Sequence, residues 1–142
     1  TGCMAGGVLS DALLRHRGSA RLARQGLSAA ALLLCAGLIF AAWKAADPLM
    51  AVLVISAGMF CAAVANPCLA ATVMRLGGTN VAAVSAVTNM CGNFGAASFP
   101  LAVPWLLAHA GGWNAVLAAF GALYIVGAVF WLLMKVERPI EE

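Results

Sequence analysis

The sequence predicts an all-α integral membrane protein with four transmembrane helices and both termini in the cytoplasm. Two observations carry this prediction: the scarcity of charge and the uneven distribution of the charges that are present. Of the 142 residues, 64% are hydrophobic and only 9% are charged, whereas a soluble domain carries about 25% charged residues. This composition argues against a water-soluble enzyme and against a nucleic-acid-binding module.

Long charge-free runs define the predicted helices. They cover residues 25–43, 48–74 and 76–134, and one crossing of the hydrocarbon core needs about 20 apolar residues. Polar, turn-rich segments at 77–80 and 109–114 divide the last run in two. We therefore expect helices at about 26–45, 48–74, 81–108 and 113–134, which together fill residues 26–134. Barrel strands would alternate apolar and polar residues, and these runs do not.

The positive charges set the predicted orientation. With four helices, both ends and the 75–80 turn share one side of the membrane. Only Lys44 lies on the other side, and the remaining basic residues are Arg15, Arg17, Arg21, Arg24, Arg75, Lys135 and Arg138. This asymmetry makes the shared side cytoplasmic. Residues 1–25 are expected to be the end of a preceding membrane helix and a basic loop, and 135–142 a cytoplasmic tail. The chain is therefore expected to be the C-terminal piece of a longer protein, missing its N-terminal helices. Its alanine-rich composition points to a bacterial cytoplasmic membrane.

The predicted helices differ in polarity. The first and fourth contain almost no polar residues and are expected to face lipid, with Trp43, Trp113 and Trp131 near the interfaces. The third carries small and polar residues within one sector of about 140°, at 100° per residue. Such a stripe is either a surface for close helix packing or the wall of an aqueous path. We take the second interpretation, and the candidate substrate-path residues are Asn66, Ser85, Thr88, Asn89 and Asn93.

Several residues inside the predicted spans weaken a straight helix. Proline removes a backbone donor, and glycine lowers helix propensity. The positions at which the second and third helices are expected to bend are Pro67, Gly92, Gly95, Pro100 and Pro104.

Patterns for catalysis, cofactors and metals are missing from the sequence. The five cysteines form no C-x-x-C pair, and neither histidine has a carboxylate or cysteine neighbour at ligand spacing. Apart from Lys44 at the end of the first span, no Asp, Glu, Lys or Arg lies inside a predicted span, although such groups commonly mark proton relays and ion sites. We therefore expect no catalytic residue, no cofactor and no metal ion here, and coupling charges outside these spans.

The segment GGVLSDALLRHRGSAR, residues 6–21, resembles the signature between the eighth and ninth helices of the major facilitator superfamily. It is most similar to the form found in the anion:cation symporter group. The Asn66-Pro67 pair, the NMCGNFG stretch at 89–95, PWLL at 104–107 and ERPI at 137–140 also fit. One departure is Ala12, because the shorter general signature has a basic residue directly after the aspartate.

The resemblance implies the last four helices of a twelve-helix transporter. In such a transporter, the tenth and eleventh helices would line the substrate cavity, and the ninth and twelfth helices would face lipid. The signature residues would form a conformational latch on the cytoplasmic face; they are Gly7, Asp11, Arg15, Arg17, Gly18 and Arg21. The alternative for the arginines is ordinary positive charge on the cytoplasmic side.

The expected function is secondary transport of a small organic anion by alternating access, coupled to protons or cations. The expected partners are the lipid bilayer, the missing helices and the anionic substrate, and no nucleic acid. The alternative is a self-contained four-helix membrane protein, either a small homodimeric exporter or a non-transporting membrane subunit. Such an exporter needs an intramembrane carboxylate, which the spans lack.

Overall fold

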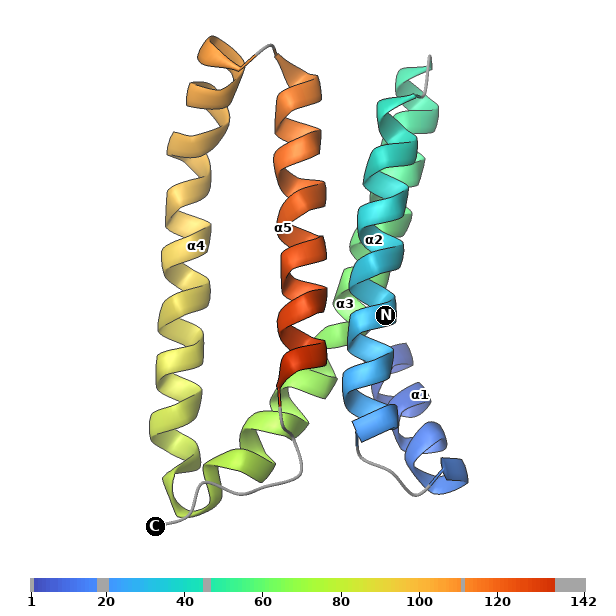
Figure 1. Ribbon diagram of the computed structural model, residues 1–142, viewed down its shortest axis with the longest axis vertical. Helices are drawn as coiled ribbons and strands as arrows, with labels where there is room; N and C mark the ends of the chain where they lie inside the picture. The colour runs from blue at the N-terminus through green and yellow to red at the C-terminus, as the bar shows by residue number, and fades with distance from the viewer. Residues whose placement is uncertain (1, 18–20, 45–46, 111, 135–142) are drawn as a thin grey trace.

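The computed structural model describes residues 2–17, 21–44, 47–110 and 112–134, and its regular structure in these ranges is helical. The elements are α1 (Gly2–Arg17), the π-helical turn η1 (Arg21–Gly26), α2 (Leu27–Trp43), α3 (Pro48–Gly77), the 3₁₀ turn η2 (Gly78–Asn80), α4 (Val81–His109) and α5 (Trp113–Leu133). Helices α2, α4 and α5 and the upper half of α3 run along the long axis of the molecule, with α1 beside the lower half of the bundle (Figure 1).

Three continuous helical stretches are long and apolar enough to cross a membrane: Arg24–Trp43, Pro48–His109 and Trp113–Leu133. The middle stretch contains α3, η2 and α4 together. Its 62 residues greatly exceed the roughly 20 that one crossing needs. The predicted helical fold is therefore confirmed for the described residues, and the three stretches are long and apolar enough for a membrane protein, whereas the number of crossings and the side of each terminus stay predictions.

The ends of the long helices follow from local chemistry. Asp47 precedes α3 in an extended conformation, and its carboxylate accepts a hydrogen bond of 3.1 Å from the backbone N–H of Leu49. Pro48 occupies the first turn, where no intrahelical donor is needed. At the other end, Gly78 has φ +48°, and Gly112 before α5 has φ +86°. Only glycine adopts these conformations without strain, so both positions allow the chain to reverse.

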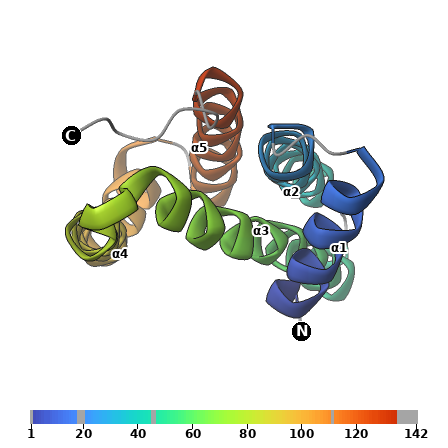
Figure 2. The same ribbon diagram turned by 90° about the horizontal axis from the view of Figure 1, so that it is seen from below.

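Helix α2 packs against both α3 and α5, which lie next to it in the view from below (Figure 2). Its buried residues are nearly all small: Ser28, Ala29, Ala31, Cys35, Ala36, Ile39 and Ala42. Small side chains let helix backbones approach closely, which is how membrane helices gain packing energy. The core of this three-helix contact is formed by Ala29, Cys68, Ala128 and Trp131.

One expectation about lipid exposure differs from this arrangement, and another stays a prediction. The nearly apolar α2 buries one face but leaves Leu33 and Leu34 exposed, so its contact with lipid stays a prediction. Trp131 was expected in an interfacial belt, yet it is 8% exposed, whereas Trp43 and Trp113 are exposed. Composition cannot separate these cases, because a surface of alanine and cysteine suits a neighbouring helix as well as lipid.

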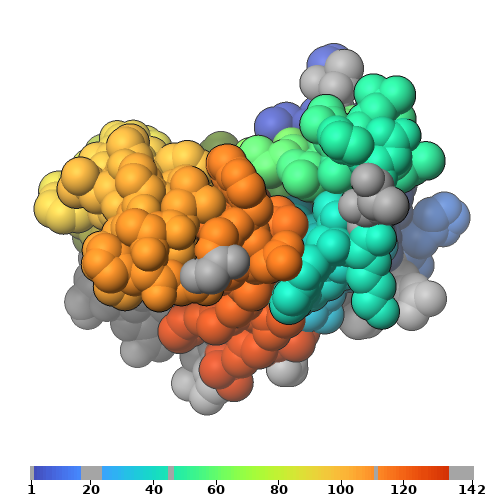
Figure 3. Space-filling view, turned by 90° about the horizontal axis from the view of Figure 1, so that it is seen from above, coloured from blue at the N-terminus to red at the C-terminus, as the bar shows by residue number. Residues whose placement is uncertain are grey.

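Helix α4 stands apart from the rest of the described chain. It meets α3 at its lower end and α5 towards its upper end (Figure 1), and none of its residues is buried. The ring centroids of Phe99 and Phe120 lie 5.3 Å apart, which joins α4 to α5. Seen from above, the upper ends of α4 and α5 lie side by side, with those of α2 and α3 beyond α5 (Figure 3). Most of the α4 surface therefore has no packing partner among the described residues.

Candidate functional site

The polar stripe of α4 lies on an exposed helix. Asn89 and Asn93 are exposed, and Ser85 is half-buried. The Thr88 hydroxyl donates a 2.8 Å hydrogen bond to the carbonyl oxygen of Val84, one turn earlier in the same helix. Threonine hydroxyl groups in membrane helices commonly donate to the carbonyl oxygen one turn earlier, so the hydroxyl needs no other hydrogen-bond partner. Within the described chain, neither asparagine amide makes a hydrogen bond, so two strong donor–acceptor groups on this stripe are free for other partners.

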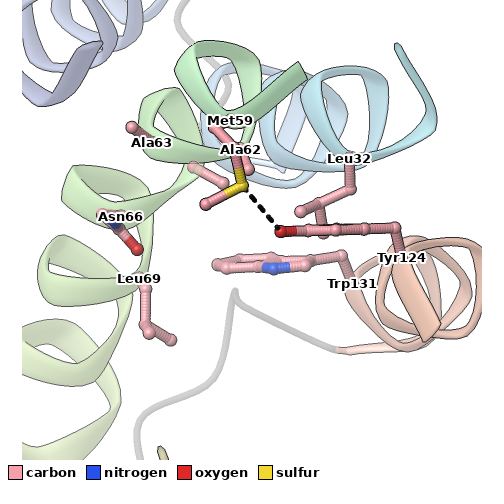
Figure 4. A pocket seen from close by; sticks show the side chains of 9 residues that line it. Leu32, Met59, Ala62, Ala63, Asn66, Leu69, Tyr124 and Trp131 are labelled. Atoms are coloured by element: carbon pink, nitrogen blue, oxygen red, sulfur yellow. Dashed lines mark hydrogen bonds between the residues drawn. The ribbon is translucent and has the colours of Figure 1, made fainter. Parts of the chain in front are cut away.

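Asn66 lies elsewhere, beside a cavity of about 370 Å³ formed by α2, α3 and α5 (Figure 4). Its Nδ2 is 3.9 Å from the Sγ of Cys3 in α1. No residue of α4 lines this cavity. The structure therefore does not bring Asn66 together with Ser85, Thr88, Asn89 and Asn93, and the five candidate path residues divide into two separate places.

The cavity beside Asn66 contains two aromatic residues that the sequence analysis did not select as site residues. Tyr124 and Trp131 line it from α5, and the Tyr124 hydroxyl points to the sulfur of Met59 at 3.9 Å (Figure 4). The rest of the wall is apolar apart from Asn66 itself. Tyr124 is the only tyrosine of the chain, and a lone phenol in an apolar helix was the signal that could have identified it.

The predicted latch residues that the structure describes lie on α1. Asp11 and Arg15 are exposed, and neither has a hydrogen bond or ion pair to another described residue. A Cβ atom at Gly7 would meet nothing within 4 Å. Gly18 and the side chains of Arg17 and Arg21 lie outside the described part, so the latch stays a prediction.

The close approach in this segment occurs at glycines that the motif did not single out. A Cβ at Gly6 would overlap the carbonyl oxygen of Val64, and one at Gly2 would lie 2.8 Å from the Cβ of Ala63. Ser10, four residues after Gly6, is also buried. One face of α1 therefore packs directly against the backbone of α3, and the Gly-x-x-x-Gly spacing is the signal that could have predicted this contact.

The candidate bending residues all lie inside continuous helices. Pro67 is within α3, and α4 runs unbroken through Gly92, Gly95, Pro100 and Pro104. The second half of α3 turns away from α2 and passes below α5 to the foot of α4 (Figures 1 and 2). The assignment of this change of direction to Pro67 stays a prediction.

Two side chains of η1 fasten the lower ends of three helices together. The Gln25 amide, which is 2% exposed, donates to the carbonyl oxygens of Trp131, at 3.1 Å, and of Met134. Arg24 donates from Nη1 to the carbonyl oxygen of Ala71 in α3 at 3.2 Å. The last carbonyls of a helix have no intrahelical partner, so Gln25 satisfies the end of α5.

A metal site would need several clustered ligands. No group of three or more His, Cys, Asp or Glu side chains is close enough to hold a metal ion in the part of the chain that the structure describes. The five cysteines are free thiols.

Comparison with protein families places the whole described fold in one family. The model of the Major Facilitator Superfamily matches residues 2–142. Comparisons with curated proteins and with solved structures found no match. The matched region contains the exposed stripe of α4, the cavity beside Asn66 and the packed core of α2, α3 and α5. The chain therefore belongs to the major facilitator superfamily of membrane transporters.

Proposed function

We propose that the chain is the C-terminal part of a secondary active transporter that moves a small organic anion by alternating access. The supporting observation is the exposed stripe of α4, in a chain that belongs to a transporter family. Transporters of this kind hold their substrate near the middle of the membrane, between two helix bundles. In this proposal the chain supplies much of one bundle, in the bacterial cytoplasmic membrane.

The two asparagines of α4 support an aqueous path. An amide that faces hydrocarbon without a partner costs several kcal/mol. Asn89 and Asn93 are exposed, and in the part of the chain that the structure describes nothing pairs with them. An aqueous path on this side of α4 would hydrate both side chains, and their N–H groups would then be available to donate to a carboxylate. Packing against a further helix would satisfy them as well, and the experiments below distinguish the two arrangements.

The coupling charges would lie outside the membrane spans described here. Helices α2 to α5 contain one charged residue, Arg75, and it lies near the end of α3. A substrate anion needs a positive counter-charge, and proton coupling needs a titratable group. We therefore assign the positive counter-charge and the titratable group to the remaining helices of the transporter. This chain would contribute the uncharged polar part of the substrate path.

The test is uptake by liposomes that contain the protein from the complete reading frame. A panel of small mono- and dicarboxylates is offered under an imposed proton gradient or sodium gradient. We expect at least one anion to accumulate against its concentration gradient, and an ionophore that collapses the driving gradient should abolish the accumulation. If the panel equilibrates no faster than in empty liposomes under either gradient, the assignment to coupled anion transport is wrong.

Alanine substitution then tests the path itself. We expect Asn89→Ala and Asn93→Ala each to weaken substrate affinity about tenfold or more, the loss typical of one hydrogen bond to a charged group. The matched control is Cys91→Ala, because Cys91 is an exposed residue of α4 and lies about 160° around the helix from Asn93, away from the stripe. Unchanged affinity and transport in both asparagine variants would show that the stripe packs against a helix.

The alternative is a self-contained four-helix membrane protein. A homodimeric exporter of that kind would place its coupling carboxylate inside a span, and Asp47, the one acidic residue described between α2 and α5, lies just before the first residue of α3. The reading frame discriminates between the two functions, because the transporter proposal requires eight further apolar spans upstream.

A further inference from the structure

A second polar site lies at the lower end of the bundle, away from both the α4 stripe and the cavity beside Asn66. It is a cavity of about 380 Å³ lined by Arg24, Ala71, Met74 and Arg75. We propose that this cavity binds the phosphate headgroup of an anionic phospholipid. The proposal is independent of the substrate and of the coupling ion.

The two arginines are brought together by the fold. Arg24 belongs to η1, and its hydrogen bond to the carbonyl oxygen of Ala71 ties the guanidinium group to α3. Arg75 follows Ala71 by four residues in the same helix, so both lie on one face of α3. A single Nη1–H of Arg24 is used in that bond, and a guanidinium has five N–H donors. Most of the donors of both side chains therefore stay available to a ligand.

The charge of the site lacks a counter-ion among the described residues. The residues that line the cavity include two cations and no carboxylate. Neither arginine forms an ion pair with another residue in the described ranges. Two like charges in one cavity repel each other, so an anion that enters it removes this repulsion. Guanidinium groups bind phosphate oxygens through paired hydrogen bonds, which makes phosphate the fitting anion.

The position of the cavity along the helices favours a lipid as the source of the phosphate. Arg24 lies three residues before α2 begins, and Arg75 lies two residues before α3 ends. Both are therefore at the level where an apolar span gives way to polar surroundings, which is where lipid headgroups lie. Met74, exposed beside Arg75, offers an apolar wall to the start of an acyl chain. Basic cavities between helices on the cytoplasmic side are suited to anionic headgroups.

The experiment is lipid binding to the purified protein in detergent, followed by native mass spectrometry. Phosphatidylglycerol and phosphatidylcholine are titrated separately. We expect phosphatidylglycerol to bind in preference to phosphatidylcholine, and Arg75→Gln to weaken its binding about tenfold, as for the loss of a charge-assisted hydrogen bond. Arg75→Lys, which keeps the charge, should recover part of the binding. Arg75 is exposed, so these substitutions leave the packed core intact.

The matched control is Arg15→Gln, because Arg15 is an exposed arginine outside the cavity. It should change phosphatidylglycerol binding less than about twofold, as is usual for an exposed charge. Equal binding of the two lipids, equal binding by Arg75→Gln and the unmodified protein, or an equal loss in Arg15→Gln would each overturn the proposal. Displacement of phosphatidylglycerol by inorganic phosphate would overturn the lipid assignment and identify a site for a soluble phosphate.

Discussion

The side-chain amide of Gln25 donates a 3.1 Å hydrogen bond to the carbonyl oxygen of Trp131, which joins residues 106 positions apart in the chain. The same amide also donates to the carbonyl oxygen of Met134. Gln25 therefore holds the end of α5 against the start of α2 at a buried position. This contact joins the lower ends of α2 and α5 in the core that these helices form with α3. Helix α4 contacts that core through α3 and α5.

Replacement of this amide is expected to destabilise the bundle. Gln25→Met keeps the length of the side chain but leaves two carbonyl oxygens without a donor, and we expect a loss of about 1–3 kcal/mol in the free energy of unfolding. Denaturant unfolding in detergent, followed by tryptophan fluorescence, measures the change. Asn114→Met is the control, because Asn114 is an exposed amide at the other end of α5. Equal stability of Gln25→Met and the unmodified protein would contradict this role.

The two neighbouring glycines of α1 are expected to respond in opposite directions to the same substitution. Gly6→Ala places a methyl group against the backbone of Val64, and we expect it to cost about 1–3 kcal/mol because the helices must move apart. Gly7→Ala meets open space and should be neutral or stabilising by about 0.5–1 kcal/mol, because alanine favours the helix. Thermal unfolding of the two variants in detergent compares them directly. A smaller loss for Gly6→Ala than for Gly7→Ala would refute the close α1–α3 contact.

Asp11 tests the latch. If its carboxylate stabilises one state of the transporter by facing a helix N-terminus, Asp11→Asn removes about 0.3–1 kcal/mol of interaction. That energy corresponds to a shift of roughly two- to fivefold in the balance between the inward-open and outward-open states. The balance is read from thiol labelling on either side of the membrane, together with the transport rate. Asp47→Asn, at the cap of α3, is the control, and no change in balance or rate for Asp11→Asn would exclude the latch.

The class of the fold could be predicted from the sequence, because long apolar runs leave the backbone in lipid no alternative to the helix. The signature at residues 6–21 also pointed to the correct superfamily. The neighbours of each helix could not be predicted in the same way. The alanine and cysteine residues of α2 pack against α3 and α5, yet lipid would accept the same side chains.

The candidate site was predicted only in part, for a related reason. Asn66 was selected for its polarity, and it does line a cavity, but Tyr124 and Trp131, which face it across that cavity, were assigned to a lipid-facing helix. Gly6 and Gly7 are neighbouring residues of the same type in one helix. Only the structure shows that the backbone of Val64 lies against Gly6 and that Gly7 faces open space. The local sequence shows where a polar or small residue lies. The residue that it contacts depends on packing between segments far apart in the chain.

The central claim, that the stripe of α4 lines an aqueous path, is tested most directly by the accessibility of position 93. In the complete transporter, a version whose only cysteine is Asn93→Cys is compared with a version that keeps only the native Cys91, using a membrane-impermeant maleimide. Cys91 is exposed, and at 100° per residue it lies about 160° around α4 from position 93, away from the stripe. We predict that the cysteine at 93 reacts at least about tenfold faster than the one at 91, since only water-exposed thiols ionise and react readily. Equal rates, or faster labelling at 91, would contradict the claim.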